Sequence, residues 1–275
     1  MHLYHPFDWL RADVISKLMQ RPPATDVETK KQIRDSTQRF DKSPIIWTLL
    51  AVGVFLLFVI RVGLFQPFNI PSGSNMPTLL IGDYLFVSKY SYGYSHYSLP
   101  FSPPIFTGRI LSRPVDRGDV VVFRLPKDDS TDYLKRVVGL PGDRIQMIGG
   151  VLNINGQPVK RERIEDFTSD EDGAPQPIRQ YRETLPNGVT YTTLALMEKG
   201  FFDNTQVYTV PPDHYFMMGD NRDNSTDSRM LSAVGYVPYE NIIGKAQIIF
   251  FSIRGGEVSR WPWTVRRHRL FTLVR

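Results

Sequence analysis

The chain has 275 residues, of which 41% are hydrophobic and 22% charged, a composition typical of a folded protein rather than a disordered one. Its formal net charge of +5 is too small, and its charges too dispersed, to indicate nucleic-acid binding. The sequence contains no cysteine, which excludes disulfides, thiolate zinc sites and cysteine nucleophiles.

The most hydrophobic run covers residues 45–60, IIWTLLAVGVFLLFVI, which carry no charge. A membrane span needs about 20 mostly apolar residues, and residues 45–65 reach that length if the side chain of Arg61 extends to the lipid headgroups. A buried core helix is disfavoured because the run is hydrophobic on every side, and a cleaved signal peptide because no small-x-small motif follows. We therefore predict a transmembrane helix over residues 45–65.

Basic residues before this run set its predicted orientation: Lys30, Lys31, Arg34, Arg39 and Lys42. By the positive-inside rule, residues 1–44 form a cytoplasmic tail, in which the amphipathic stretch WLRADVISKLMQ predicts a short interfacial helix. Everything after Phe65 then lies outside the cytoplasm, in the periplasm of a Gram-negative cell. No second run of similar length occurs, so we predict a single-pass protein of the inner membrane.

Short segments rich in Val, Ile, Tyr and Phe, and bounded by Gly, Pro, Asp or Asn, follow from residue 83 onward and are typical of β-strands. They cover residues 83–89, 119–125, 132–139, 143–149, 151–156, 189–196, 214–220 and 243–253. Asn155-Gly156 predicts the tight turn of a hairpin. We expect a mainly β, predominantly antiparallel outer domain over residues 66–275. Within it, residues 146–212 form an insertion or second β subdomain, and the turn-rich residues 163–188 form a long loop or insertion.

A Ser-Gly-Ser turn lies in residues 71–77, PSGSNMP, shortly after the predicted span. A serine hydroxyl becomes an effective nucleophile only beside a base, and the glycine between Ser72 and Ser74 lets backbone approach a substrate closely. Pro71 and Pro77 stiffen the two sides of the turn. Because such turns are common in loops, an ordinary surface loop stays open as an alternative.

The second candidate is a lysine within the predicted strand of residues 132–139. In a strand, Tyr133, Lys135 and Val137 share one face, so Lys135 lies on an apolar face. Burial disfavours the ammonium form and lowers the pKa of a lysine, and a neutral lysine can take the proton of a serine. The alternative is an edge-strand lysine that protects against aggregation.

The third candidate is the polar segment FMMGDNRDNSTDSR, residues 216–229. A calcium loop is one interpretation, but the acidic spacing is irregular and Arg222 and Arg229 are poor neighbours for a cation. We favour a hydrogen-bonded loop that orients another group, and predict no metal. The five histidines leave a Ser-His-Asp triad open, although no G-x-S-x-G or H-E-x-x-H motif occurs.

The C-terminal segment SRWPWTVRRHRLFTLVR is basic and contains Trp261 and Trp263. Tryptophan together with arginine suits a membrane interface. A solvated basic tail whose two tryptophans join the core fits the same residues equally well.

Taken together, four segments resemble the boxes of bacterial type I signal peptidases, which are membrane-anchored serine proteases with a Ser-Lys dyad. They are PSGSNMPTLLIGDYLFVSKYSYG, similar to the nucleophile box P-S-x-S-M-x-P-T-L, then RGDVVVFRLP, DYLKRVVGLPGD, and MGDNRDNSTDSR followed by GYVP. Their order, the 61 residues from Ser74 to Lys135, and the preceding apolar run agree with that family. The resemblance covers residues 45–150 and 205–255.

The resemblance implies that Ser74 is the nucleophile and Lys135 the general base. It also implies that the backbone N–H of Ser74 and the hydroxyl of Ser72 form the oxyanion hole. Neutral Lys135 would take the Ser74 proton, an acyl-enzyme would form on Ser74, and Lys135 would then activate water. Losing one oxyanion donor typically costs about 10²–10³ in rate.

Supporting roles are implied by the last box. Ser225 is similar to the serine that hydrogen-bonds and orients the lysine, and Asp227 with Arg229 resembles a supporting ion pair. The chain departs from the family pattern at Asn75, because methionine usually follows the nucleophile. This departure concerns the packing beside the dyad and the fit of substrate.

The partners that the resemblance implies are secretory preproteins with small residues at positions −1 and −3, together with membrane phospholipid. No cofactor and no nucleic acid are expected. Two alternatives come from other classes: a catalytically silent, membrane-anchored β-domain that binds secreted chains, for which Asn75 is the only support, and a Ser-Lys protease that processes itself or a regulator, as SOS-type repressors do.

Overall fold

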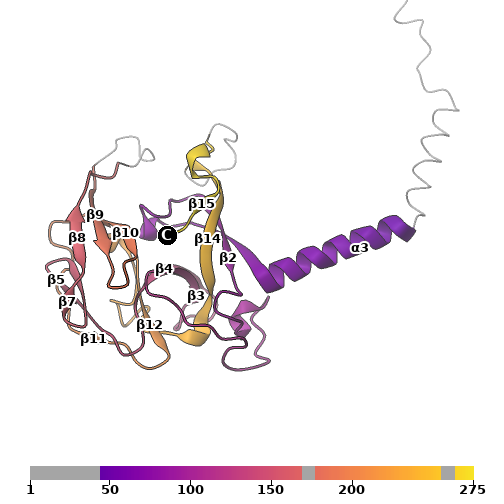
Figure 1. Cartoon of the computed structure of the whole chain (residues 1–275), viewed down its shortest axis with the longest axis horizontal. Coiled ribbons are helices and arrows are strands. Elements are labelled where there is room, and N and C mark those ends of the chain that lie inside the picture. Colours follow the sequence, from indigo (N-terminus) through magenta and orange to yellow (C-terminus); the bar gives the residue numbers. More distant parts are fainter. Residues whose placement is uncertain (1–43, 169–176, 255–263) are drawn as a thin grey trace, which may run out of the picture. The chain divides into compact units, whose positions relative to one another are not determined.

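A computed structural model describes residues 44–168, 177–254 and 264–275 (Figure 1). The chain divides into two units, with the boundary between Leu57 and Phe58. The predicted cytoplasmic tail up to residue 43, with its interfacial helix, lies outside the described residues, and so do Trp261 and Trp263.

The described part of the first unit belongs to helix α3, Pro44–Val59, which is apolar apart from Thr48. None of its residues is buried, and Thr48 Oγ1 donates to the Pro44 carbonyl at 2.7 Å. The π-helix η1, Ile60–Leu64, follows α3 in the chain. Among the described residues, no helix combines the length and apolar character that a membrane crossing requires. The predicted helix over residues 45–65 is thus an α-helix followed by a π-helix, and the span itself stays a prediction.

The second unit is built around an eight-stranded sheet in the order β1-β2-β14-β3-β4-β12-β13, with β15 paired to β14. The strands are β1 Phe65–Asn69, β2 Asp83–Ser88, β3 Val120–Arg124, β4 Asp132–Gly139, β12 His214–Met218, β13 Val237–Pro238, β14 Ile242–Ser252 and β15 Thr272–Leu273. All of these pairings are antiparallel. The predicted mainly β, antiparallel fold is therefore confirmed. In Figure 1 the long golden strand β14 bridges β2 and β3, which are distant in sequence.

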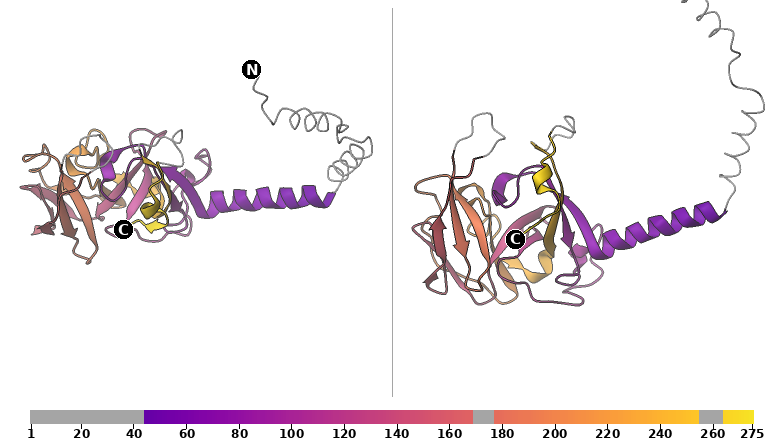
Figure 2. Two further views of the ribbon diagram at one scale, coloured as in Figure 1. Left: turned by 90° about the horizontal axis from the view of Figure 1, so that it is seen from above. Right: turned by 45° about the horizontal axis from the view of Figure 1, so that its top comes forward.

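Two smaller sheets lie in the region predicted as an insertion, residues 146–212. One has the order β11-β5-β6-β7 and the other β10-β9-β8. Their strands are β5 Arg144–Ile148, β6 Val151–Ile154, β7 Gln157–Pro158, β8 Lys160–Arg163, β9 Arg179–Thr184, β10 Thr190–Ala195 and β11 Tyr208–Thr209. Figure 2 shows these magenta-to-orange strands gathered apart from β14. Asn155 and Gly156 have φ of 55° and 79°, as the predicted hairpin turn between β6 and β7 requires.

Of the two predictions for residues 163–188, the long loop is wrong, because the described part of this segment contains β9 and the last residue of β8. β9, RQYRET, lacks the apolar alternation that marks a strand. Its buried residue is Glu183, which pairs with Arg222 at 2.5 Å and with Arg161 at 3.6 Å. A buried ion-pair network replaces an apolar face here.

The packing of the core explains why the sequence of β3 is almost entirely apolar. Val121 and Phe123 pack into one buried cluster together with Val137 of β4, whereas Val120 and Val122 pack into another. Both faces of β3 are therefore buried, and the alternation of period two separates the two clusters. Within β4, Tyr133 packs with Val137 and Leu134 packs on the opposite side, as predicted.

In the described part of the C-terminal segment, two arginines pair inside the domain, whereas Phe271 and Leu273 are 72% and 56% exposed. Arg269 binds the buried carboxylate of Asp83 at 2.6 Å, and Arg266 lies 3.6 Å from the same carboxylate. These cations pair inside the domain because Asp83, at the start of β2, has no exposed surface. Strand β15 then pairs with β14.

Candidate active site

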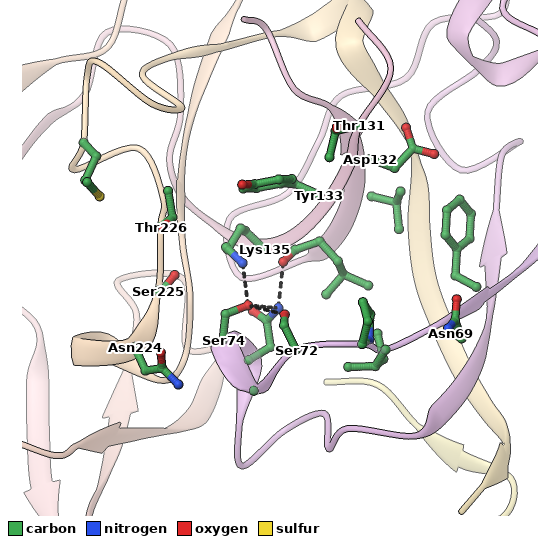
Figure 3. A pocket seen from close by; sticks show the side chains of 18 of the residues that line it. Asn69, Ser72, Ser74, Thr131, Asp132, Tyr133, Lys135, Asn224, Ser225 and Thr226 are labelled. Carbon is green, nitrogen blue, oxygen red and sulfur yellow. Dashed lines mark hydrogen bonds between the residues drawn. The ribbon is translucent and has the colours of Figure 1, made fainter. Parts of the chain in front are cut away.

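A cavity of about 660 Å³ opens where three segments that are far apart in sequence meet. The first is the turn after β1, the second is strand β4, and the third is the polar loop after β12. Its lining includes Ser72, Ser74, Asn75, Lys135 and Ser225. Figure 3 shows Lys135 pointing from β4 toward Ser74. All three sequence candidates therefore contribute to one cavity.

Ser74 lies in the 3-10 helix η2, Gly73–Asn75, and is only 8% exposed. Backbone bonds fix this short helix, since the Leu79 N–H donates to the Asn75 carbonyl at 3.0 Å. The polar loop holds it from the other side: the Asn221 N–H donates to the Ser74 carbonyl at 3.1 Å, and Asn221 Nδ2 donates to the Gly73 carbonyl at 3.0 Å. The serine side chain is thus set on a rigid turn.

Close packing between the turn and the loop depends on Gly219. A Cβ at this position would lie 2.5 Å from the Ser74 carbonyl oxygen and 2.2 Å from Ser225 Oγ. Both distances are far below van der Waals contact, so only glycine allows the polar loop to approach the serine turn this closely.

Lys135 donates from Nζ to Ser74 Oγ at 2.6 Å, and the lysine is 4% exposed. Burial lowers its pKa from 10.5 to about 8, with a further lowering by Arg229, whereas Asp227 and Asp220 act in the opposite direction. The Tyr133 ring lies 5.4 Å from Nζ. A substantial fraction of Lys135 is therefore neutral at mildly alkaline pH, and its nitrogen lies within reach of the serine proton.

Ser72 lies beside Ser74, with its Oγ 3.4 Å from Ser74 Oγ. Ser72 is exposed, whereas Ser74 is buried. A hydroxyl at the rim of the cavity can turn toward a group bound there. This position is compatible with donation to an oxygen of a substrate.

Asp227 and Arg229 form a buried, two-point ion pair next to the cavity. Arg229 Nη2 lies 2.8 Å from Asp227 Oδ2, and Arg229 Nε lies 2.8 Å from Oδ1. Burial opposes ionisation of Asp227, but the charge of Arg229 and its hydrogen bonds outweigh it and hold the pKa of that carboxyl below its usual range. The Gly219 N–H also donates to Asp227 at 3.0 Å. The pair thus braces the loop that contacts the serine turn.

Ser225 lines the cavity, but it differs from what the family resemblance implies. Its Oγ is buried and does not bond Lys135 in this structure, and it acts instead on the Asp227 carboxylate, whose pKa it helps to lower. The carboxylates of the same loop are directed to protein groups rather than to a common cation site: Asp220 to Arg136, Asp223 to the Met197 N–H, and Asp227 to Arg229. The calcium interpretation therefore has no support. The cavity lining contains no histidine, which argues against a Ser-His-Asp triad at Ser74.

Two contacts of the site have no signal in the sequence. Asn75 Nδ2 donates to the Leu134 carbonyl at 2.6 Å and lies 3.4 Å from Ser74 Oγ. Asp220, which follows Gly219, binds Thr78 Oγ1 at 2.6 Å and Arg136. Neither contact can be predicted from the residue pattern within one segment, because the two partners of each contact come from different segments.

Comparison with known proteins gives consistent matches. The family model described as "Signal peptidase, peptidase S26" matches residues 44–251. The chain is 45% identical over 249 residues to signal peptidase I of Rickettsia conorii, a match that covers 82% of this chain and 91% of the relative. Signal peptidase I of Rickettsia akari matches with the same identity and coverage. A crystal structure of a signal peptidase I from Enterococcus faecalis is 26% identical and covers 48% of this chain and 97% of its own, with a TM-score of 0.29.

Proposed function

Because the chain belongs to the signal peptidase family, peptidase S26, we propose that it removes N-terminal signal peptides from exported preproteins by a Ser74–Lys135 dyad. Membership of this family makes the chain a peptidase and disfavours a catalytically silent binding domain. The observation that carries the dyad is the 2.6 Å contact between Lys135 Nζ and Ser74 Oγ inside a cavity. A general base must lie at this distance from the proton it removes.

The proposed reaction begins with neutral Lys135. Its Nζ takes the proton of Ser74 Oγ, and the resulting alkoxide attacks the carbonyl carbon of the scissile peptide bond. The Ser74 N–H and the Ser72 hydroxyl donate to the oxyanion that develops. Protonated Lys135 then gives its proton to the leaving amine as the C–N bond breaks, which leaves an acyl-enzyme on Ser74. A water activated by Lys135 hydrolyses this ester and restores both residues.

The supporting roles belong to the polar loop. Asp227 and Arg229 form an ion pair next to Lys135 whose opposite charges largely cancel in their effect on the lysine. Burial therefore remains the main cause of the lowered pKa of Lys135. Ser225 lines the cavity with a buried Oγ that is not bonded to Lys135. We assign it to orienting the lysine once substrate is bound.

The proposed substrates are preproteins with small residues at positions −1 and −3. The cavity lining includes the apolar residues Ile70, Val122 and Leu134. Shallow apolar subsites of this kind accept a small side chain and reject a large one by steric overlap. No cofactor takes part in the proposed reaction.

We further propose that residues 45–65 anchor the protein in the inner membrane, with residues 1–44 in the cytoplasm and the catalytic domain, residues 66–275, in the periplasm. The apolar, unburied surface of α3 and the basic residues that precede it in the sequence support this topology. Residues 146–212 form a β insertion within the catalytic domain. Membrane phospholipid is then a partner of residues 45–65.

The test is cleavage of a preprotein by the full-length enzyme in detergent micelles. Ser74→Ala and Lys135→Ala should each abolish cleavage without lowering the melting temperature by more than a few degrees. Matched controls are Ser112→Ala and Lys127→Ala, because both residues are exposed and neither lines the cavity. Full cleavage activity in either Ser74→Ala or Lys135→Ala would contradict the proposed mechanism.

A further inference from the structure

Asn75 follows Ser74 in η2 and is 4% exposed, so its carboxamide is a buried polar group beside the candidate nucleophile. Its Nδ2 makes both contacts already described: a 2.6 Å hydrogen bond to the Leu134 carbonyl and a longer contact of 3.4 Å to Ser74 Oγ. One amide group therefore reaches the serine and strand β4 at the same time.

The chemistry of the Leu134 carbonyl fixes which end of the Asn75 carboxamide faces it. The Leu134 carbonyl can only accept a hydrogen bond, so the group directed to it must be the NH₂. Leu134 immediately precedes Lys135 in β4, so holding the Leu134 carbonyl also holds the backbone from which the lysine side chain extends. An apolar side chain at position 75 would leave this carbonyl without the donor.

We propose that Asn75 is a positioning residue for peptide-bond cleavage by the Ser74–Lys135 dyad. Its NH₂ group holds the turn of Ser74 against the strand of Lys135, and it donates a hydrogen bond to Ser74 Oγ as the alkoxide develops. This inference rests on the proposed dyad. Asn75 keeps both of its protons throughout, and the serine proton moves only to Lys135 Nζ. The contact to Ser74 Oγ is long in the resting state and shortens as negative charge develops on that oxygen.

The charged groups around Lys135 make this role measurable. Asp227, Asp220 and Arg229 act on the lysine from the polar loop, and the Tyr133 ring lies near Nζ on its own strand. At position 75, between Ser74 and Leu134, the side chain is neutral. A carboxylate placed there would add a negative charge next to the dyad and favour protonated Lys135.

The experiment compares two variants of the full-length enzyme in detergent micelles with a peptide substrate. Asn75→Leu keeps the branched shape but removes the donor, and should lower kcat about 10- to 100-fold with KM changed less than about twofold. Asn75→Asp keeps the shape and adds a charge, and should shift the acid limb of the kcat/KM profile to higher pH by about one unit.

The matched control is Asn241→Leu. Asn241 is also buried and also donates from Nδ2 to a backbone carbonyl, that of Arg124 at 2.9 Å, but it does not line the cavity. This variant should lower the melting temperature while leaving kcat and the pH profile unchanged. A reduced kcat in Asn75→Leu with a shifted limb in Asn75→Asp supports the positioning role.

Three results would overturn the inference while leaving the dyad in place. They are wild-type kcat in Asn75→Leu, an unshifted acid limb in Asn75→Asp, and a loss of kcat in Asn241→Leu equal to that in Asn75→Leu. If Asn75→Leu does not fold, the isosteric Asn75→Asp variant decides alone by its pH profile. Failure of the proposed function is distinct, because Ser74→Ala would then still cleave the substrate.

Discussion

Arg136 and Asp220 form a buried two-point ion pair that joins the lysine strand to the polar loop. Arg136 Nη2 lies 2.7 Å from Asp220 Oδ2, and Arg136 Nε lies 2.8 Å from Oδ1, with side chains 0% and 2% exposed. Arg136 follows Lys135, and Asp220 precedes Asn221, whose N–H holds the Ser74 carbonyl. The ion pair therefore helps to fix the distance between the two candidate catalytic side chains.

Breaking this pair should strongly destabilise the protein. In Arg136→Met, Asp220 stays buried and loses its cation, so the free energy of unfolding should fall by about 3–5 kcal/mol, as is typical when one partner of a buried pair is removed. Asp220→Asn should cost a similar amount because it leaves Arg136 buried without an anion. Denaturant titration of the detergent-solubilised enzyme measures both.

The double variant Arg136→Met/Asp220→Asn provides the control for that measurement. Its loss should be smaller than the sum of the two single losses, because no uncompensated charge stays buried. Strictly additive losses, or single losses below about 0.5 kcal/mol, would show that the pair is not coupled.

Most strands could be predicted from the sequence because their signals are local, whereas Ser74 and Lys135 are paired only by the resemblance of four separate segments to one family. β3 and β4 follow from runs of β-branched residues, and Lys135 stands out as a cation on an apolar face. β9 could not be predicted, since its buried side chain is a glutamate that depends on Arg222, 39 residues away. Tertiary pairing, rather than propensity, makes that segment a strand.

Within the site, the sequence predicted which segments contribute side chains to the cavity, but not which hydrogen bonds those side chains make. The hydrogen bond of Asn75 requires knowing that Leu134 lies opposite it, 59 residues along the chain. Ser225 is brought to the cavity as expected, yet its Oγ does not bond Lys135. Single contacts depend on side-chain geometry, which sequence spacing does not define.

The pH dependence of cleavage should follow Lys135. Because burial lowers the pKa of this lysine to about 8, the neutral base forms as pH rises through that value. Activity should therefore be half-maximal near pH 8 on the acid side and fall about tenfold for each pH unit below it. Initial rates of preprotein cleavage between pH 6 and 10 test this. Activity that stays constant down to pH 6 would indicate a different base.

The same pKa shift predicts the sign of a stability effect. The pKa of Lys135 is about 8 in the folded protein and 10.5 in the reference state, so the unfolded chain binds more protons between these values. The lysine's contribution to stability consequently rises with pH across this window and is least favourable below pH 8. Lys135→Met should melt at a higher temperature than wild type at pH 7, and the difference should shrink as pH approaches 10.5.

The proposed membrane topology can be tested with single cysteines, because the chain contains none of its own. Phe101 is fully exposed in the second unit, so Phe101→Cys should react with a membrane-impermeant maleimide in intact spheroplasts. Lys30→Cys, placed before the apolar run, should react only after the membrane is permeabilised, since the positive-inside rule keeps this segment in the cytoplasm. Wild type, which has no thiol, controls for background labelling. Equal labelling of both variants in intact spheroplasts would contradict a span at residues 45–65, whereas protection of Lys30→Cys alone would support it.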